Sequence, residues 1–324
     1  MTADCSVGII GAGGVAARHA EVLSGFGDVR IAGVADTDVD RAGALARRCG
    51  ATPYPHHEEL LAREELDAVY ICVPPFAHGP AELAAVDAAL PFFVEKPLGV
   101  DTSAAEDIAA RVRERGLLTA VGHQWRYLEA VERARELLAG REVRMVLGHW
   151  LDKVPPVGWW ARADRSGGQV VEQAAHVVDL ARLLAGEVES VHALESETRA
   201  AGIPDADVAA ATVATLRFRG GAVGTLAATC LLAWKHRAGV EVYAEGLALE
   251  VSEAGLRVHT AAEPELFEDD GTAKERVDRA FVDAVLGRGG DVRTDYAEAL
   301  RTHRVTCAIA ESALTGAAVR PHAG

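Results

Sequence analysis

The sequence is short of positive charge. Its 324 residues contain 33 Lys and Arg against 48 Asp and Glu, which gives a formal net charge of −15. Such a surface repels phosphate backbones, so nucleic acid is not expected as a partner. No uncharged apolar run approaches the length of a membrane span, and the start, MTADC, lacks the basic and apolar segments of a signal peptide. We therefore expect a cytoplasmic protein with no membrane partner.

Cysteine is also scarce. The five cysteines stand far apart with no C-x-x-C pair, and several lie in apolar runs. This spacing indicates free thiols in a reducing compartment. The adjacent His56 and His57 invite a metal site, but neighbouring side chains diverge and no cysteines or carboxylates complete one. No metal is expected.

A glycine-rich turn follows the first apolar strand. Residues 6–16 read SVGIIGAGGVA, a strand that leads into Gly11, Gly13 and Ala16, and a helical pattern follows. The next strand ends in Asp36, about where a dinucleotide fingerprint requires an acid. In that fingerprint Gly11 makes the tight turn, Gly13 lets the pyrophosphate approach the backbone, and Ala16 keeps the helix close to the sheet.

Asp36 is expected to select the cofactor. Its carboxylate would accept hydrogen bonds from the adenosine ribose and repel a 2′-phosphate, and Thr37 supplies no cation, so NAD is favoured over NADP. Arg41, one helical turn further, could soften that preference. The alternative is that the glycines only make a turn and Asp36 caps the helix expected at 39–49, which should end at Gly50.

Strand and helix patterns alternate through the first third of the chain. Three further strands are expected in nearly all-apolar runs, at 67–73, at FFVEK (92–96) and at LLTAVG (117–122), the last of which is counted as the sixth strand. This pattern predicts a doubly wound parallel sheet, a Rossmann fold. A buried ammonium at the end of an apolar strand is costly and needs a partner or a purpose. Ligands of such sheets collect outside the carboxyl ends of the strands, so Lys96 is aimed at the cofactor crevice.

With GIIGAGGVAARHAEVL, VAD, DAVYICVPPFAH and EKPLG in this order, the chain resembles the Gfo/Idh/MocA family of NAD(P)-dependent oxidoreductases. VGHQWRYLEAVERARELL (121–138) resembles the family's crossing into its second domain, and SGGQVVEQAAHVVDLARLLAGE (166–187) resembles its G-G-x-x-x-D-x-x-x-H-x-x-D segment. We place a dinucleotide-binding domain at 1–122 and a domain for substrate binding and oligomerisation at 123–324.

The resemblance implies that Lys96 and His176 lie close to the nicotinamide and the reacting carbon. Glu172 stands where the family more often has an aspartate that orients this histidine. The residues expected at the cofactor are Gly11, Ala12, Gly13, Gly14, Val15, Ala16, Asp36, Thr37, Cys72, Val73, Pro74, His78, Glu95, Lys96 and Arg126. Those expected at the substrate are Lys96, Tyr127, Trp159, Glu172 and His176.

The residues themselves also suggest a site around His176. Helical periodicity over 169–184 places Glu172, His176 and Asp179 on one face. A carboxylate one turn from an imidazole fixes its tautomer and raises its basicity, as in a general base, whereas the alternative is a structural, half-buried histidine.

Two other groups have a plain packing alternative. His78 more readily caps or packs the following helix than takes part in catalysis. Trp150, Trp159 and Trp160, in a proline-rich loop, would form an aromatic wall for a sugar ring or anchor the loop.

From Val143 onward the pattern changes to longer strands with hairpin turns, such as Gly220 and Gly221 between two apolar runs. We expect an α+β domain with a large, mostly antiparallel sheet, helices on one face and a long final helix. Apolar residues on both sides of the strands, namely Val213, Thr215 and Leu216 near Leu226 and Ala228, indicate that the free face joins copies into a dimer or tetramer.

The predicted activity is hydride transfer between NAD(H) and a secondary alcohol carbon of a sugar, inositol or related polyol. Lys96 and His176 would handle the hydroxyl proton, and Glu172 would orient His176. Two alternatives stay open, a glycosidase that uses bound NAD transiently and a dinucleotide-binding sensor without catalysis.

Overall fold

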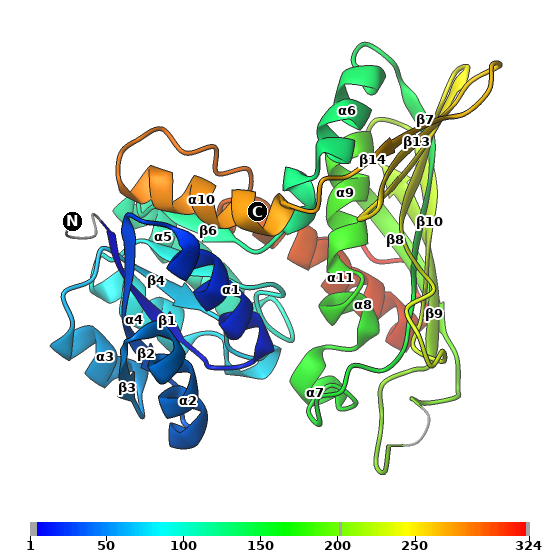
Figure 1. Cartoon of the computed structure of the whole chain (residues 1–324). Helices are drawn as coiled ribbons and strands as arrows, with labels where there is room; N and C mark the ends of the chain where they lie inside the picture. Colours follow the sequence, from blue (N-terminus) through cyan, green and yellow to red (C-terminus); the bar gives the residue numbers. More distant parts are fainter. Residues whose placement is uncertain (1–4, 201–202, 322–324) are drawn as a thin grey trace. The chain divides into compact units, whose positions relative to one another are not determined.

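Residues 5–200 and 203–321 are described by the computed structural model. They fall into two units, each built from separate stretches of chain. The first unit holds the described residues up to Gly99, together with Ser103–Gly122 and Lys274–Glu298. The second holds Val100–Thr102, His123–Ala273 and the described residues from Ala299 on. Sequence patterns place Lys274–Glu298 in the second domain, but in the structure this segment packs with the first unit (Figure 1).

A six-stranded parallel sheet forms the first unit, in the order β3-β2-β1-β4-β5-β6. Its strands are β1 (Cys5–Ile10), β2 (Val29–Ala35), β3 (Thr52–Tyr54), β4 (Ala68–Ile71), β5 (Phe92–Val94) and β6 (Thr119–Val121). The sheet is doubly wound and parallel, as predicted from the sequence. Strands β4 and β5 are wholly buried, as their continuous apolar runs require.

Helices cover both faces of this sheet (Figure 1). They are α1 (Gly14–Gly25), α2 (Val39–Cys49), α3 (His57–Arg63), η1 (Pro75–Ala77), α4 (Pro80–Asp87), α5 (Ser103–Arg115) and α10 (Ala273–Val285). Phe281 of α10 packs on Phe93, and Tyr296, at the start of α11 (Tyr296–Thr315), packs on the neighbouring Phe92. Because adjacent strand residues point to opposite faces, α10 and the start of α11 cover opposite faces of the sheet.

Helix α2 has the predicted bounds and the predicted end. Gly50 closes it in the left-handed region, with φ 67°. Its N-cap is Asp38, which accepts a hydrogen bond from the Arg41 N–H at 3.1 Å. The alternative in which Asp36 caps this helix is therefore wrong.

An eight-stranded sheet forms the core of the second unit, in the order β14-β13-β12-β11-β7-β10-β9-β8. Its strands are β7 (Val143–Leu151), β8 (Val188–Glu195), β9 (Ala211–Phe218), β10 (Val223–Thr229), β11 (Arg237–Ala244), β12 (Leu247–Ser252), β13 (Gly255–His259) and β14 (Glu265–Glu268). Only β7 and β10 pair in parallel, so the sheet is mostly antiparallel, as predicted.

Helices lie on one face of this sheet (Figure 1). The helical segments of this unit are η2 (Gln124–Tyr127), α6 (Glu129–Leu138), α7 (Ala163–Ser166), α8 (Gln169–Glu172), α9 (Ala175–Ala185) and most of α11. The described residues include no helix of the length and apolar character that a bilayer crossing needs.

The other face of the sheet carries exposed apolar side chains. Strand β9 alternates buried and exposed residues, with Val213 54% exposed and Leu216 buried. Leu194 and Val223 on the flanking strands are 64% and 49% exposed. Val213 and Thr215 lie on this exposed face, and Leu216, Leu226 and Ala228 lie on the buried one, so the residues named from the sequence do occupy both sides of the strands. That the exposed face joins copies of the chain stays a prediction.

Candidate active site

The glycine-rich turn opens at the carboxyl end of β1. Gly11 has φ 92°, and a Cβ at this position would lie 2.5 Å from the carbonyl oxygen of Cys72. Gly13 is the N-cap of α1, and a Cβ built there would meet nothing within 4 Å. The turn therefore presents open backbone and a helix N-terminus, the combination that holds a pyrophosphate.

The Asp36 carboxylate stiffens this turn. Its Oδ2 accepts a hydrogen bond from the Ala12 N–H at 2.7 Å, and its Oδ1 accepts one from the Asp38 N–H at 2.8 Å. The Arg41 guanidinium reaches the same Oδ1 at 3.1 Å. The Asp36 side chain is still 10% exposed, so part of its carboxylate remains accessible at the end of β2, as a ribose-binding acid requires. Together the open glycine turn and this acid fit a dinucleotide.

Residues after β4 and β5 lie at the same edge of the sheet as the glycine turn, because the three strands are neighbours and parallel. Cys72 is buried; its N–H donates to the Ile10 carbonyl at 2.7 Å, and burial raises the pKa of its thiol well above the usual value. The Glu95 N–H donates to the Ile71 carbonyl at 2.9 Å, so the chain is still paired with β4 immediately before Lys96. Lys96 is half-buried and joined to Pro97 by a cis peptide bond.

His78 packs at the start of α4. Its Nδ1 is hydrogen-bonded to the Glu82 carboxylate, which also accepts the Gly79 N–H at 2.8 Å. Burial by itself raises the pKa of Glu82, but the neighbouring His78 charge and hydrogen bond bring it below the usual value. The contact matches the packing alternative given above for His78.

The helix predicted over 169–184 is broken in two. Helix α8 ends at Glu172, and α9 begins at Ala175. Between them the Ala174 N–H donates to the Gln169 carbonyl at 3.1 Å, an i to i+5 step with one residue more than the α-helical spacing. Glu172 and His176 are therefore not one turn apart on a regular helix, and the predicted shared face is wrong at this point.

Glu172 is held by a tryptophan. Its Oε2 accepts a hydrogen bond from the Trp160 Nε1–H at 2.8 Å. Trp160 is fully buried and belongs to a small core that includes Val208 and Cys230, and Trp159 packs against it. Trp160 therefore anchors its loop, while Trp159 is half-buried.

The His176 imidazole lies in a cluster of rings. It stacks on Trp125, with centroids 5.4 Å apart and planes at 19°, and lies 6.3 Å from Trp150. His123 meets it edge-on at 5.8 Å, and the Lys235 ammonium lies 5.0 Å from the Trp150 ring. These neighbours restrict the orientation of the His176 ring, which is only 5% exposed. Periodicity along the helix could not reveal these neighbours, because they come from η2 and the residue before it, from β7 and from the segment between β10 and β11.

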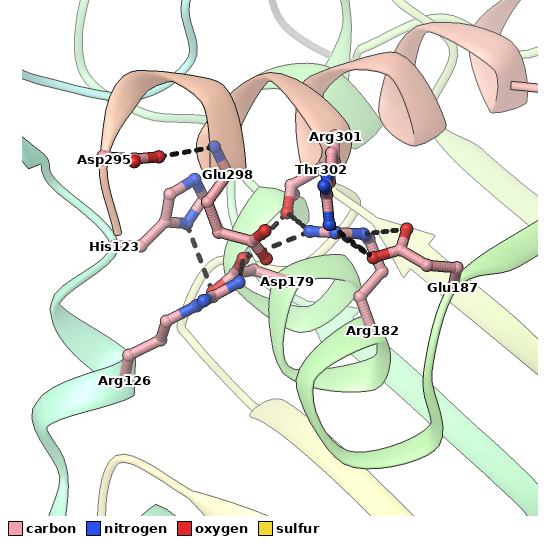
Figure 2. Close-up of polar contacts among 9 residues, drawn as sticks. All are labelled: His123, Arg126, Asp179, Arg182, Glu187, Asp295, Glu298, Arg301 and Thr302. Atoms are coloured by element: carbon pink, nitrogen blue, oxygen red, sulfur yellow. Dashed lines mark hydrogen bonds and ion pairs between the residues drawn. The ribbon is translucent and has the colours of Figure 1, made fainter. Parts of the chain in front are cut away.

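A buried ionic cluster stands one turn further along α9 (Figure 2). The Asp179 carboxylate accepts hydrogen bonds from Arg126 Nε and Nη2, each at 2.7 Å, and from the Thr302 hydroxyl at 2.7 Å. Burial by itself raises the pKa of Asp179, but His123, Arg126 and Thr302 hold it well below its usual range. Arg126, predicted at the cofactor, is in this structure the partner of Asp179 in the second unit. Tyr127 beside it is buried.

No three His, Cys, Asp or Glu side chains gather as a metal site in the described part of the chain. The parallel sheet, its glycine turn, the acid after β2 and the large second sheet define a two-unit dinucleotide-binding protein.

Comparison with known proteins identifies the family. Residues 5–123 match the model described as the oxidoreductase family with an NAD-binding Rossmann fold, and residues 131–250 match the GFO/IDH/MocA C-terminal domain. The chain belongs to this oxidoreductase family, and its first unit is the family's NAD-binding Rossmann fold.

Three similar proteins illustrate the range of the family. D-xylose 1-dehydrogenase (NADP(+)) 2 of Haloferax volcanii is 31% identical over 60% of this chain and 62% of its own length. Inositol 2-dehydrogenase of Rubrobacter xylanophilus is 29% identical over 74% of this chain and 69% of its own. The solved structure of GenD2 from gentamicin A biosynthesis in complex with NAD has a TM-score of 0.87 and 26% identity, covering 100% of this chain and 98% of that one.

Proposed function

We propose that the protein is a dehydrogenase that transfers a hydride between NAD(H) and a secondary alcohol or ketone carbon of a sugar, inositol or related polyol. The observation that carries this proposal is that the glycine turn after β1 and Lys96 after β5 open on one edge of the parallel sheet. The relatives named for D-xylose and inositol act on polyhydroxylated compounds, which supports this substrate class.

NAD would be held by the backbone at Gly11 and Gly13 and by the Asp36 carboxylate. When bound, it supplies the hydride acceptor or donor of the reaction. The anionic Asp36 favours NAD over NADP because it repels a 2′-phosphate, and the charge of Arg41 is already offset by Asp36 and Asp38. The name of the Haloferax enzyme shows that NADP preference occurs among the relatives, so the test must include both cofactors.

Lys96 and His176 are assigned to the proton of the substrate hydroxyl. An ammonium and an imidazole are the groups that exchange protons near neutral pH once their surroundings tune them. Glu172, fixed by Trp160, is assigned to orienting His176. In this scheme the ring cluster around His176 restricts the imidazole to one plane, which lowers the cost of reaching the reactive geometry.

The first experiment is a screen of NAD and NADP reduction against cyclic polyols, aldoses and sugar acids, followed at the nicotinamide absorbance. Lys96→Met and His176→Asn should each lower turnover about a thousandfold while NAD still binds. Lys274→Met, at an exposed lysine of the same unit, is the matched control. Full turnover in Lys96→Met would remove Lys96 from the mechanism. Release of an aglycone without accumulation of NADH would instead identify the transient-NAD glycosidase.

We also propose a homodimer or homotetramer through the open face of the second sheet. Leu194 and Val213 are cross-strand partners on this face, and both are more than half exposed, at 64% and 54%. Val213→Glu should convert the assembly to smaller species in light scattering after gel filtration. Val39→Glu, at an equally exposed apolar residue of α2, should not. A wild-type protein that is monomeric at about ten micromolar would overturn this proposal.

A further inference from the structure

Glu95, the residue before Lys96, belongs to a cluster of four ionic side chains. The Oε1 of Glu95 lies 2.9 Å from His19 Nε2 and accepts a hydrogen bond from Arg18 Nη2 at 3.0 Å. On the other side of the ring, His19 Nδ1 lies 2.7 Å from Oδ1 of Asp278. Arg18 and His19 come from α1, which follows the glycine turn, and Asp278 comes from α10. We call Arg18, His19, Glu95 and Asp278 the His19 cluster.

The central members of this cluster are removed from water. The side chains of His19 and Asp278 are each 1% exposed, and that of Glu95 is 9% exposed. Burial lowers the pKa of His19, but Asp278 and Glu95 outweigh it and raise this pKa to about 9. The ring is therefore an imidazolium at neutral pH, with one N–H donated to each carboxylate. Burial alone would raise the pKa of Glu95, and the hydrogen bond and charge of His19, with Arg18 and Lys96, lower it.

The Glu95 carboxylate is also enclosed sterically. A Cβ at Gly122, just after β6, would lie 2.6 Å from each carboxylate oxygen of Glu95. The backbone of Glu95 is fixed as well, because its N–H donates to Ile71. Rings fill the remaining space around the imidazole: Tyr70 and Phe93 lie with centroids 5.4 and 5.0 Å from it. Both the main chain and the side chain of the residue before Lys96 are thus held.

A buried ionic cluster is poor evidence of stabilisation, since apolar residues of the same volume are often as stable. Its location suggests a different use. We propose that His19 is a positioning residue: by holding Glu95 between α1 and α10, it fixes the Lys96 segment relative to the helix that begins at the glycine turn. The inference rests on the proposed role of Lys96 in the reaction. With the cofactor anchored at the start of α1, the fixed Glu95 keeps the proton-transfer group after β5 in a constant position relative to that cofactor.

Amide hydrogen exchange of the full-length protein tests the positioning directly and needs no substrate. In His19→Gln we expect the peptide that contains residues 95–99 to exchange about tenfold faster, with little change in peptides of α2 and β3. Arg279→Gln is the matched control, because it removes ion pairs of the next residue on α10 with Asp28 and Asp283 and leaves the His19 cluster intact. If His19→Gln does not fold, Asp278→Asn is used in its place, since an asparagine keeps the shape of the aspartate side chain and removes its charge. Unchanged exchange at 95–99, or equal acceleration throughout the first unit, would overturn the inference.

Kinetics separate this inference from the proposed function. With a substrate found in the panel, His19→Gln should lower kcat about tenfold and leave the Kd of NAD within about twofold. The same substitution in the Lys96→Met background should have no further effect on kcat, because His19 acts through Lys96. If no compound of the panel is turned over, the proposed function fails, and the exchange measurement still tests the positioning. If Lys96→Met retains full turnover, the proposed role of Lys96 fails. If Lys96→Met loses turnover but the His19→Gln effect is the same in both backgrounds, only the positioning inference fails.

Discussion

Arg126 and Asp179 form a two-point ion pair inside the second unit, with Nε and Nη2 of the guanidinium each 2.7 Å from a different carboxylate oxygen. Both side chains are buried, at 5% and 1% exposure. Removing the Asp179 charge takes from the buried guanidinium its two-point ionic partner. We therefore expect Asp179→Asn to lower the free energy of unfolding by about 3 kcal/mol, measured by urea denaturation near neutral pH.

The contribution of Asp179 to the free energy of unfolding should also depend on pH, in a direction that its pKa sets. Because the pKa of Asp179 is lowered in the folded state, its contribution is present above the usual value of 3.8 and is lost as the pH falls below it. The difference between wild type and Asp179→Asn should shrink over that acidic range. Arg133→Gln, which breaks an exposed pair with Glu136, should cost less than about 1 kcal/mol. An equal cost for both variants would contradict the assignment.

Asp36 should govern the choice of cofactor. In Asp36→Ser the charge that repels a 2′-phosphate is gone and Arg41 is released from one of its partners. We expect the KM for NADP to fall and the KM for NAD to rise, each about tenfold, in initial-rate measurements. Asp38→Ser also removes a partner of Arg41 but leaves the contact between Asp36 and the Ala12 N–H. The same change in both variants would show that Arg41, and not Asp36, sets the preference.

The hydrogen bond from Trp160 to Glu172 should matter for turnover. Trp160→Phe preserves most of the buried ring but leaves the carboxylate oxygen without this donor. We expect kcat to fall about tenfold with the Kd of NAD unchanged. Trp234→Phe, at a tryptophan that is 58% exposed, should leave both constants as in the wild type. If Trp160→Phe retains its kcat, Glu172 needs no such support.

The contribution of His19 to the free energy of unfolding should fall at alkaline pH. Its folded pKa of about 9 lies above the usual 6.5, so its contribution is complete below 6.5 and is lost as the pH rises through about 9. The difference in unfolding free energy between wild type and His19→Gln should therefore decrease over this range in urea titrations. Arg279→Gln should show a constant difference there, since a guanidinium stays protonated. A constant difference for His19→Gln would mean that the ring is neutral in the folded protein.

Local signals in the sequence were enough for much of the first sheet. The glycine turn, the end of α2 at Gly50 and the apolar strands β4 and β5 depend on residues a few positions apart, so their patterns are visible directly. The edge strand β3 was not singled out, because three residues that include Pro53 show no period. In the second sheet the turn at Gly220 and Gly221 gave the hairpin of β9 and β10.

The parts that failed depend on distant contacts. The i to i+5 step at Ala174 leaves the apolar pattern of 169–184 unbroken, so periodicity cannot reveal it. The partners of His176 and Asp179 come from η2, β7 and α11, at separations that no local pattern encodes. Segment 274–298 begins with an ordinary amphipathic helix, and contacts with residues far away in the sequence, such as Asp278 with His19 across 259 positions, show where it belongs.

The placement of α10 limits how the molecule can be divided. A polypeptide that stops after Gly122 would contain all six strands of the first sheet yet lack the helix that covers Tyr70 and Phe93 and supplies Asp278. Such a piece would expose aromatic surface and leave an imidazolium with one counter-ion fewer, so it should aggregate when expressed alone. An isolated nucleotide-binding unit of this protein must therefore contain two separate segments of the chain. Residues 274–298 have to be fused to residues 5–122 or added to them as a second polypeptide.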